Sequence, residues 1–113
     1  MFIINEKDVE KGEKISKWLI GPWNTSINEV ELGVAEFRKG DSFKPHFHLE
    51  VQEILYIIEE QIEINVNNQN QNLNKGTAIY FEPNEAHSLK VLSDYAKVLT
   101  IKSPSRPKDK FYI

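Results

Sequence analysis

Turn-forming residues recur along the chain, and their spacing limits the fold more than any other feature of the sequence. They lie at Gly21-Pro22, Lys39-Gly40-Asp41, Glu59-Glu60, Asn67-Asn68, Lys75-Gly76, Pro83-Asn84 and Ser93-Asp94. The segments between them are rich in β-branched and aromatic residues, which predicts strands at 15–20, 30–37, 53–58, 61–66, 77–81, 87–92 and 96–101. No long segment has a helical period. Many short strands between frequent turns predict a sandwich or barrel of antiparallel strands.

Two of these predicted strands differ in the arrangement of their apolar residues. Residues 61–66 alternate between apolar and polar, so one face of this strand should be exposed to water. Residues 53–58, EILYII, are almost continuously apolar, so we expect both faces of this strand to be buried. The asparagine- and glutamine-rich segment 65–74 is expected to form a hairpin with its tip near Asn67-Asn68, because asparagine tolerates a positive φ.

The size and charge of the chain narrow the classes of partner. Its 113 residues suit one domain, 1–113, and a net charge of −3 favours neither nucleic acid nor an anionic membrane as a partner. The chain has no cysteine, so a metal would be held by imidazole, carboxylate, carbonyl oxygen or water. The N-terminal residues lack the apolar core of a signal peptide, and no apolar run approaches the roughly 18 residues of a membrane span. We therefore expect a cytoplasmic protein.

Two histidines one residue apart stand at the centre of the segment KPHFHLEVQE, 44–53. In a strand, residues i and i+2 face the same side, so His46 and His48 should project together, with Phe47 on the other face. Glu53 follows His48 at an odd spacing and reaches the same face only if the chain bends between them. We expect that bend at 49–52, with Glu53 opening an adjacent antiparallel strand.

The third histidine, His87, belongs to the segment GTAIYFEPNEAHS, 76–88. A glycine begins a strand there, the strand ends at Glu82-Pro83, a turn follows, and His87 opens the next strand. Imidazole nitrogens together with one carboxylate suit Fe(II), Mn(II), Ni(II), Zn(II) or Cu(II) and do not distinguish among them.

These two segments carry a family resemblance. GDSFKPHFHLEVQEILYIIEE, 40–60, resembles the first cupin motif, and GTAIYFEPNEAH, 76–87, resembles the second. The resemblance covers about residues 30–101, with N-terminal strands or a lid before it and a C-terminal arm from 102 to 113. It implies an all-β fold, a cupin-type jelly-roll barrel of antiparallel strands. It also implies one divalent transition metal, whose ligands are His46, His48, Glu53 and His87. The alternative is that these are ordinary surface or core histidines.

The sequence departs from the cupin motifs at two turns. Glu60 stands where the first motif usually ends in glycine, so we expect a different turn type or local strain in the hairpin IEEQI. Asn84 stands where the second motif usually has a turn glycine, a milder change because asparagine visits the left-handed region. Neither change removes a predicted ligand.

Four further residues are candidates for a site. Tyr56 and Tyr80 could donate a phenol proton to a bound molecule, although packing in the barrel is the simpler interpretation. Gln52 could orient a ligand imidazole or touch substrate. Arg38 could clamp a carboxylate or phosphate with its forked guanidinium, with surface solvation as the alternative.

The resemblance leaves several functions open. The leading hypothesis is a metal-dependent enzyme that binds and transforms a small polar molecule. Its reaction would be a dioxygenase-type oxidation or the isomerisation, epimerisation or lysis of a sugar or small acid. The alternatives are a non-catalytic cupin that binds or senses a sugar or carboxylate, and a metal that merely stabilises the barrel. The resemblance also implies a homodimer, for which residues 2–5 and 97–101 would be apolar strands that need a covered edge.

Overall fold

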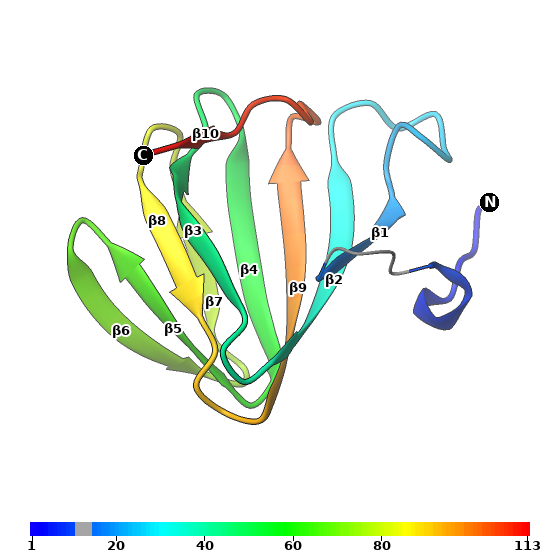
Figure 1. Cartoon of the computed structure of the whole chain (residues 1–113). Helices are drawn as coiled ribbons and strands as arrows, with labels where there is room; N and C mark the ends of the chain where they lie inside the picture. The colour runs from blue at the N-terminus through cyan, green and yellow to red at the C-terminus, as the bar shows by residue number, and fades with distance from the viewer. Residues whose placement is uncertain (11–14) are drawn as a thin grey trace.

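Two five-stranded antiparallel sheets face each other in the computed structural model, which describes residues 1–10 and 15–113 (Figure 1). The first sheet has the order β1-β2-β9-β4-β7 and the second the order β10-β3-β8-β5-β6. The strands are β1 (Ser16–Ile20), β2 (Glu31–Arg38), β3 (Ser42–Phe47), β4 (Gln52–Glu59), β5 (Gln61–Val66), β6 (Gln69–Asn74), β7 (Ala78–Phe81), β8 (His87–Lys90), β9 (Tyr95–Ser103) and β10 (Phe111–Tyr112), and a short 3-10 helix spans Glu6–Asp8. The predicted all-β fold of jelly-roll type is confirmed.

The turns adopt the backbone conformations that their residues predict. Asn67 and Asn68 both have positive φ, 52° and 64°, and join β5 to β6, which confirms the expected hairpin tip. Asn84 has a φ of 69° in the turn before β8. Glu60 also lies in the left-handed region, with a φ of 62°, between β4 and β5. A glutamate in this region is strained because its Cβ approaches the following carbonyl oxygen, so the expected local strain is confirmed.

The hydrophobic core lies between the two sheets. Every second residue of β4, β5 and β9 points inward, and the bulkiest fully buried side chains are Phe37, Phe81, Ile57, Ile62, Val91 and Val98. Burial of such side chains stabilises the fold by roughly 1.5–3 kcal/mol each before the entropy cost is subtracted.

The expectation that both faces of 53–58 are buried was wrong. In β4, Leu55 and Ile57 point into the core, whereas Ile54, Tyr56 and Ile58 are 41%, 42% and 37% exposed. β4 lies between β9 and β7, so both of its edges are paired, but only one face of its sheet packs against the other sheet. An apolar run of this length therefore does not establish that both faces are covered within one chain.

The chain ends also differ in part from expectation. Residues 97–101 belong to β9, which lies between β2 and β4 and has no free edge, and residues 2–5 form no strand. The C-terminal arm forms the outer strand of the second sheet, because β10 pairs with β3 (Figure 1). Among the described residues, no helix is long and apolar enough to cross a membrane.

Candidate metal centre

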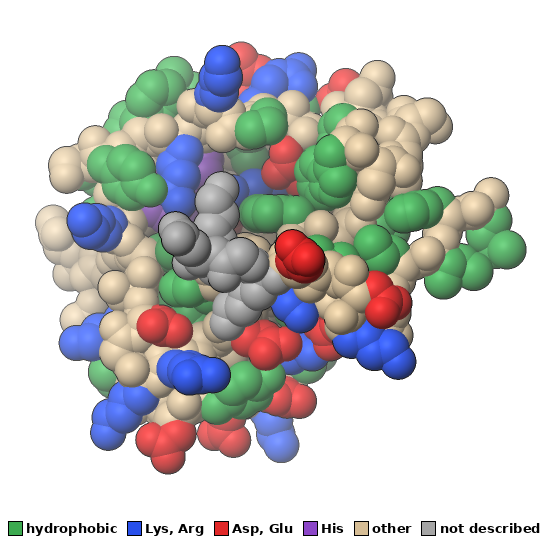
Figure 2. Space-filling view, turned by 45° about the vertical axis from the view of Figure 1, so that its right-hand side comes forward, with side chains coloured by type: hydrophobic (Ala, Val, Ile, Leu, Met, Phe, Trp, Pro, Cys, Tyr) green, Lys and Arg blue, Asp and Glu red, His purple; other side chains and the backbone are tan. Residues whose placement is uncertain are grey.

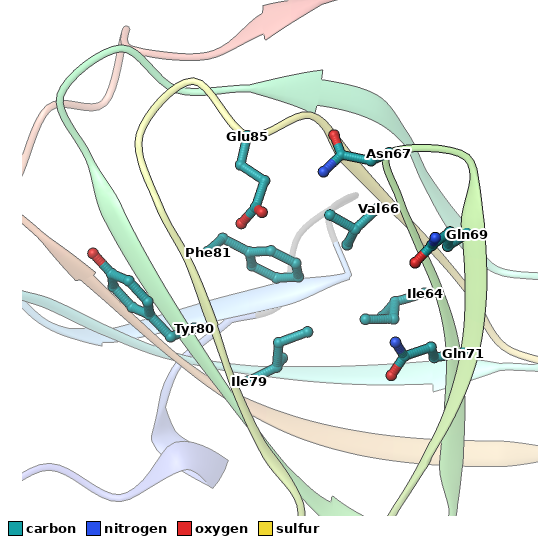
Figure 3. A pocket seen from close by; sticks show the side chains of 9 residues that line it. All are labelled: Ile64, Val66, Asn67, Gln69, Gln71, Ile79, Tyr80, Phe81 and Glu85. Atoms are coloured by element: carbon teal, nitrogen blue, oxygen red, sulfur yellow. The ribbon is translucent and has the colours of Figure 1, made fainter.

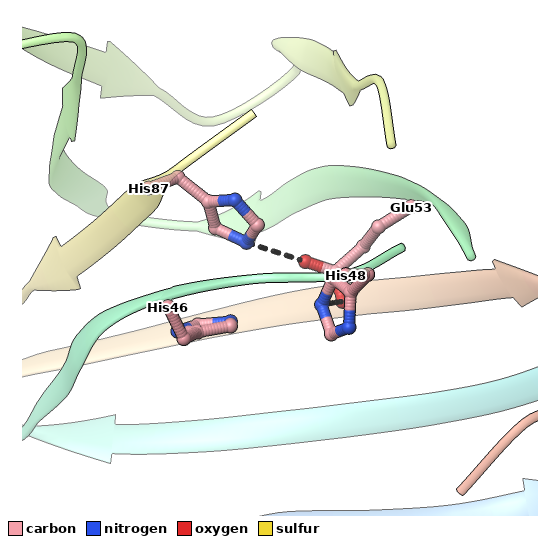
Figure 4. Close-up of side chains that lie close together, drawn as sticks. All are labelled: His46, His48, Glu53 and His87. Carbon is pink, nitrogen blue, oxygen red and sulfur yellow. Dashed lines mark ion pairs between the residues drawn. The ribbon is translucent and has the colours of Figure 1, made fainter. Parts of the chain in front are cut away.

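The three histidines and Glu53 converge from the inner faces of both sheets (Figure 4). His46 belongs to β3 and pairs directly with His87 of the neighbouring β8, while His48 follows the end of β3. Glu53 comes from β4 in the opposite sheet. The expectation that the Glu53 strand is adjacent to the His46 strand was therefore wrong. The chain crosses from one sheet to the other at 48–51. Because of this crossing, the side chain of Glu53 faces the same interior as His48 despite the odd spacing between them.

The four side chains are buried close together. Their exposed fractions are 5% for His46, 3% for His48, 6% for Glu53 and 5% for His87. One ligand atom of each lies within 4.8 Å of the others, and the Nε2 of His87 lies 3.3 Å from a carboxylate oxygen of Glu53. Histidine atoms are visible between neighbouring side chains on the face shown in Figure 2, so the cluster lies close to the surface at this end of the sandwich.

Backbone carbonyl groups fix the tautomer of every histidine. The Nδ1 of His46 lies 2.7 Å from the oxygen of Lys44, and that of His87 lies 3.0 Å from the oxygen of Glu85. The Nδ1 of His48 contacts the oxygen of Asp109. A carbonyl oxygen only accepts hydrogen bonds, so each Nδ1 carries a proton, and a ring in its neutral form keeps its lone pair on Nε2.

The lone pairs that remain are suited to a cation. The Nε2 atoms of His48 and His87 are buried without a hydrogen-bond partner among the described residues, a costly arrangement unless something else binds there. A carboxylate oxygen 3.3 Å from an imidazole nitrogen needs a positive charge between them, which either a proton on Nε2 or a metal ion provides. A divalent metal supplies that charge and satisfies all four groups, so the residues fit the metal site that the spacing predicts.

The electrostatics hold three of the candidate ligands, His46, His48 and Glu53, in the protonation states that bind metal. Burial lowers the pKa of His46 to about 4 and also lowers the pKa of His48. Burial alone would raise the pKa of Glu53, but the nearby His87 and the Lys102 ammonium lower it to about 2. At neutral pH, His46 and His48 are uncharged and Glu53 is ionised, so a metal displaces no proton from these three groups.

A second feature of the site is Lys102, which sequence reasoning missed and which packs against Trp18. Lys102 lies opposite both Glu31 and Glu53 in the first sheet, and its Nζ is 3.5 Å from a carboxylate oxygen of Glu53. The same ammonium lies over the Trp18 ring, 5.2 Å from its centroid. Trp18 in turn packs over Gly33, where a Cβ would come within 2.6 Å of the ring. No local pattern marks Lys102, because the contact depends on strand register.

The structure does not bring the other candidate residues to the cluster. Tyr56 and Tyr80 point outward from the first sheet and are 42% and 47% exposed. Gln52 is exposed beside Glu53 and lies opposite Ser103 at the end of β4. Arg38 is exposed at the far end of β2, opposite Tyr95, whereas the other end of β2 lies opposite Lys102. Their functional roles stay predictions.

A cavity of about 290 Å³ lies beside the cluster, between the β5-β6 hairpin and β7 (Figure 3). Asn67, Gln69 and Gln71 line one side with amide groups, and Phe81 forms part of the apolar side. Phe81 also stacks on the His87 ring, with centroids 3.9 Å apart and an angle of 7° between the planes. One aromatic ring therefore separates this cavity from the candidate ligands.

The family model described as the cupin domain matches residues 33–102 of the chain. Solved structures share the fold across almost its whole length. KdgF from Halomonas sp. is 20% identical, with a TM-score of 0.78 over 95% of this chain and 96% of that one. The polyketide cyclase RemF from Streptomyces resistomycificus is 19% identical, with a TM-score of 0.84 over 100% of this chain and 85% of that one. A predicted oxalate decarboxylase from Thermotoga maritima is 15% identical, with a TM-score of 0.76 over 92% of this chain and 100% of that one. A comparison with curated proteins gave no match.

Proposed function

The chain belongs to the cupin family, and on that premise we propose that it is a metal-dependent cupin that transforms a small polar molecule. Its four ligands would be His46, His48, Glu53 and His87, with one divalent transition metal per chain. The observation that carries this proposal is the arrangement of the three histidines. The Nδ1 of each contacts a backbone carbonyl oxygen, and one ligand atom of each histidine and of Glu53 lies within 4.8 Å of the others.

A metal held in this way would leave coordination positions for a substrate and would act there as a Lewis acid and a template. The donor set suits iron, manganese, nickel, zinc or copper. The reaction classes that fit are a dioxygenase-type oxidation and the isomerisation, epimerisation or lysis of a sugar or small acid. The chain's own residues must bind and orient the substrate beside the four ligands.

Among these substrates the side chains favour a small acid. Lys102 places an ammonium beside a ligand carboxylate, and its side chain remains 20% exposed at this end of the sandwich. An ammonium with three donors binds a substrate carboxylate through a charge-assisted hydrogen bond. The Trp18 ring beneath it keeps the amine in place by a cation–π contact and offers a flat apolar wall for the rest of the substrate.

Metal content tests the first part of the proposal. Protein made without a histidine tag should contain about one transition metal per chain by mass spectrometry, and a His46→Ala/His48→Ala variant should lose it. Wild-type protein that stays metal-free after reconstitution with each candidate ion would refute the metal site. A screen of loaded protein with small acids and sugars follows. Tight binding of a small molecule without turnover would refute the enzyme hypothesis and favour a non-catalytic cupin that binds or senses that molecule.

We also propose a homodimer in which a second copy covers the outer face of the first sheet. Ile54 lies opposite Tyr80 in this sheet, and Tyr56 and Ile58 extend the same apolar face along β4. Burial of these side chains would account for the apolar run that one chain leaves half exposed. Light scattering should give the mass of a dimer for the wild type and that of a monomer for Tyr56→Arg. A wild-type monomer at micromolar concentration would refute this assembly.

A further inference from the structure

The C-terminal segment 104–113 lies outside the matched family region, yet it reaches the candidate metal centre. Asp109 is the point of contact. Its two carboxylate oxygens accept hydrogen bonds from three consecutive backbone N–H groups, those of Leu49 at 2.7 Å, Glu50 at 2.8 Å and Val51 at 2.9 Å. These amides belong to the crossing that carries the chain from His48 to Glu53, where no strand partner is available for them. One side chain therefore holds the connection between two candidate ligands.

The backbone of the same residue holds one ligand directly. The carbonyl oxygen of Asp109 accepts the hydrogen bond from Nδ1 of His48, which fixes the ring orientation and leaves Nε2 for a metal. Lys44 and Glu85 do the same for His46 and His87, but each lies two residues from its histidine. For His48 the partner is 61 residues away in the chain. Its position depends on the docking of the whole segment.

Contacts on both sides of Asp109 keep the segment in place. Before it, the hydroxyl group of Ser105 donates to the buried carboxylate of Glu31, with 2.6 Å between the oxygens. After it, β10 pairs with β3, which places Tyr112 opposite His46. In the same strand pair, the rings of Phe111 and Phe47 stack with centroids 5.6 Å apart. The segment thus contacts β2, the 48–51 crossing and β3.

We propose that Asp109 is a positioning residue of the metal centre, and that docking of segment 104–113 and metal binding strengthen each other. This inference rests on the proposed metal site. The geometry that Asp109 imposes on His48 and the 49–51 amides is the geometry that a metal requires, so a bound metal favours the docked segment. By thermodynamic linkage the docked segment then favours the metal by the same factor.

A merely structural role for Asp109 makes a different prediction, and Asp41 supplies the matched control. Its carboxylate also caps a backbone N–H, that of Arg38 at 2.8 Å, in the turn between β2 and β3. Asp41→Ala and Asp109→Ala both remove a carboxylate that accepts backbone hydrogen bonds, but only the Asp109 carboxylate holds the connection between two candidate ligands. Asp109→Ala keeps the backbone carbonyl that contacts His48, so its effect on the metal acts through the position of the segment.

The first experiment measures the affinity of each variant for Co(II) by competition with a chelator of known affinity. Asp109→Ala should bind Co(II) about 10- to 100-fold more weakly than wild type, the range found for partners that orient a metal ligand. Asp41→Ala should leave the affinity close to that of wild type, because its carboxylate binds the backbone N–H of Arg38 and not a candidate ligand. Asp109→Asn keeps one acceptor oxygen and should lie between wild type and Asp109→Ala. Equal Co(II) affinity in both alanine variants would overturn the inference.

The second experiment uses the unmodified protein. Trypsin cuts after lysine, and Lys108 and Lys110 stand on either side of Asp109. Co(II) should slow cleavage at these two bonds about 10-fold or more, if coupling has the size expected for the affinity change. Cleavage after Lys75, in a turn that touches none of the candidate ligands, should keep its rate.

The outcomes separate the two proposals. Wild-type protein that takes up no Co(II) or other candidate ion defeats the proposed function. Protein that binds Co(II) while cleavage after Lys108 and Lys110 keeps its metal-free rate defeats the inference and leaves the metal site standing. In the His46→Ala/His48→Ala variant, Co(II) should leave all cleavage rates unchanged. Protection in that variant would also overturn the inference, because the metal would then act elsewhere.

Discussion

Mild acid should destabilise the metal-free protein through His46. The unfolded chain binds a proton at this residue with a pKa near 6.5, whereas burial lowers the folded pKa to about 4. Between these values the unfolded state binds more protons, so the free energy of unfolding falls as pH falls from about 6.5 to about 4. The full loss is about 3 kcal/mol, at 1.36 kcal/mol per pKa unit, and most of it has appeared at pH 4.5.

Urea unfolding at pH 7.5 and pH 4.5 in the presence of a chelator measures this loss, with Trp18 and Trp23 as fluorescent probes. Other groups titrate over the same range, so the comparison with His46→Gln isolates the contribution of His46. The variant should lose roughly 2–3 kcal/mol less than wild type between the two pH values. Equal losses in the two proteins would refute the reasoning. Glu53 adds a separate loss below pH 4.5, because its folded pKa is lowered to about 2.

The remaining predictions concern single side chains. Glu60→Gly should stabilise the protein by about 0.5–1 kcal/mol in thermal or urea unfolding, because relief of roughly 1–2 kcal/mol of left-handed strain exceeds the entropy cost of glycine. Glu59→Gly, within β4, should destabilise it, and a like effect of both changes would contradict this account. Lys102→Met should weaken oxalate binding to the Co(II)-loaded protein about 10-fold, followed by visible absorption, and leave imidazole binding unchanged. An unchanged oxalate affinity would exclude Lys102 as the anion anchor. Gly33→Ala should lower the free energy of unfolding by about 1–3 kcal/mol, because its Cβ would overlap the Trp18 ring. Wild-type stability in this variant would show that Trp18 moves aside freely.

The features that could be predicted from sequence are those set by neighbouring residues. His46 and His48 share a face because strand side chains alternate, and Asn67-Asn68 turns the chain because asparagine accepts a positive φ. Glu53 and His87 follow His46 and His48 at spacings that a family sequence motif includes, so the motif predicted all four candidate ligands.

The rest depends on contacts between distant segments. The placement of Glu53 in the opposite sheet follows from the order of all ten strands, and alternation within one strand does not specify it. Lys102 meets Glu53 through the register of β9 against β4, and Asp109 meets His48 through the docking of the C-terminal segment. The outward face of β4 was wrongly predicted for a different reason. Its apolar residues predict burial, but the sequence does not say whether the same chain or a partner covers them.

The division of the candidate ligands between the sheets gives Glu53 a mechanical role. His46 and His87 lie on adjacent strands of the second sheet and His48 directly follows one of them, so Glu53 alone anchors the cluster to the first sheet. A bound ion would link the two sheets, and its bond to Glu53 would be the one that resists their separation. A chain without that carboxylate could still carry metal on its three imidazoles, yet the metal would no longer tie one half of the protein to the other.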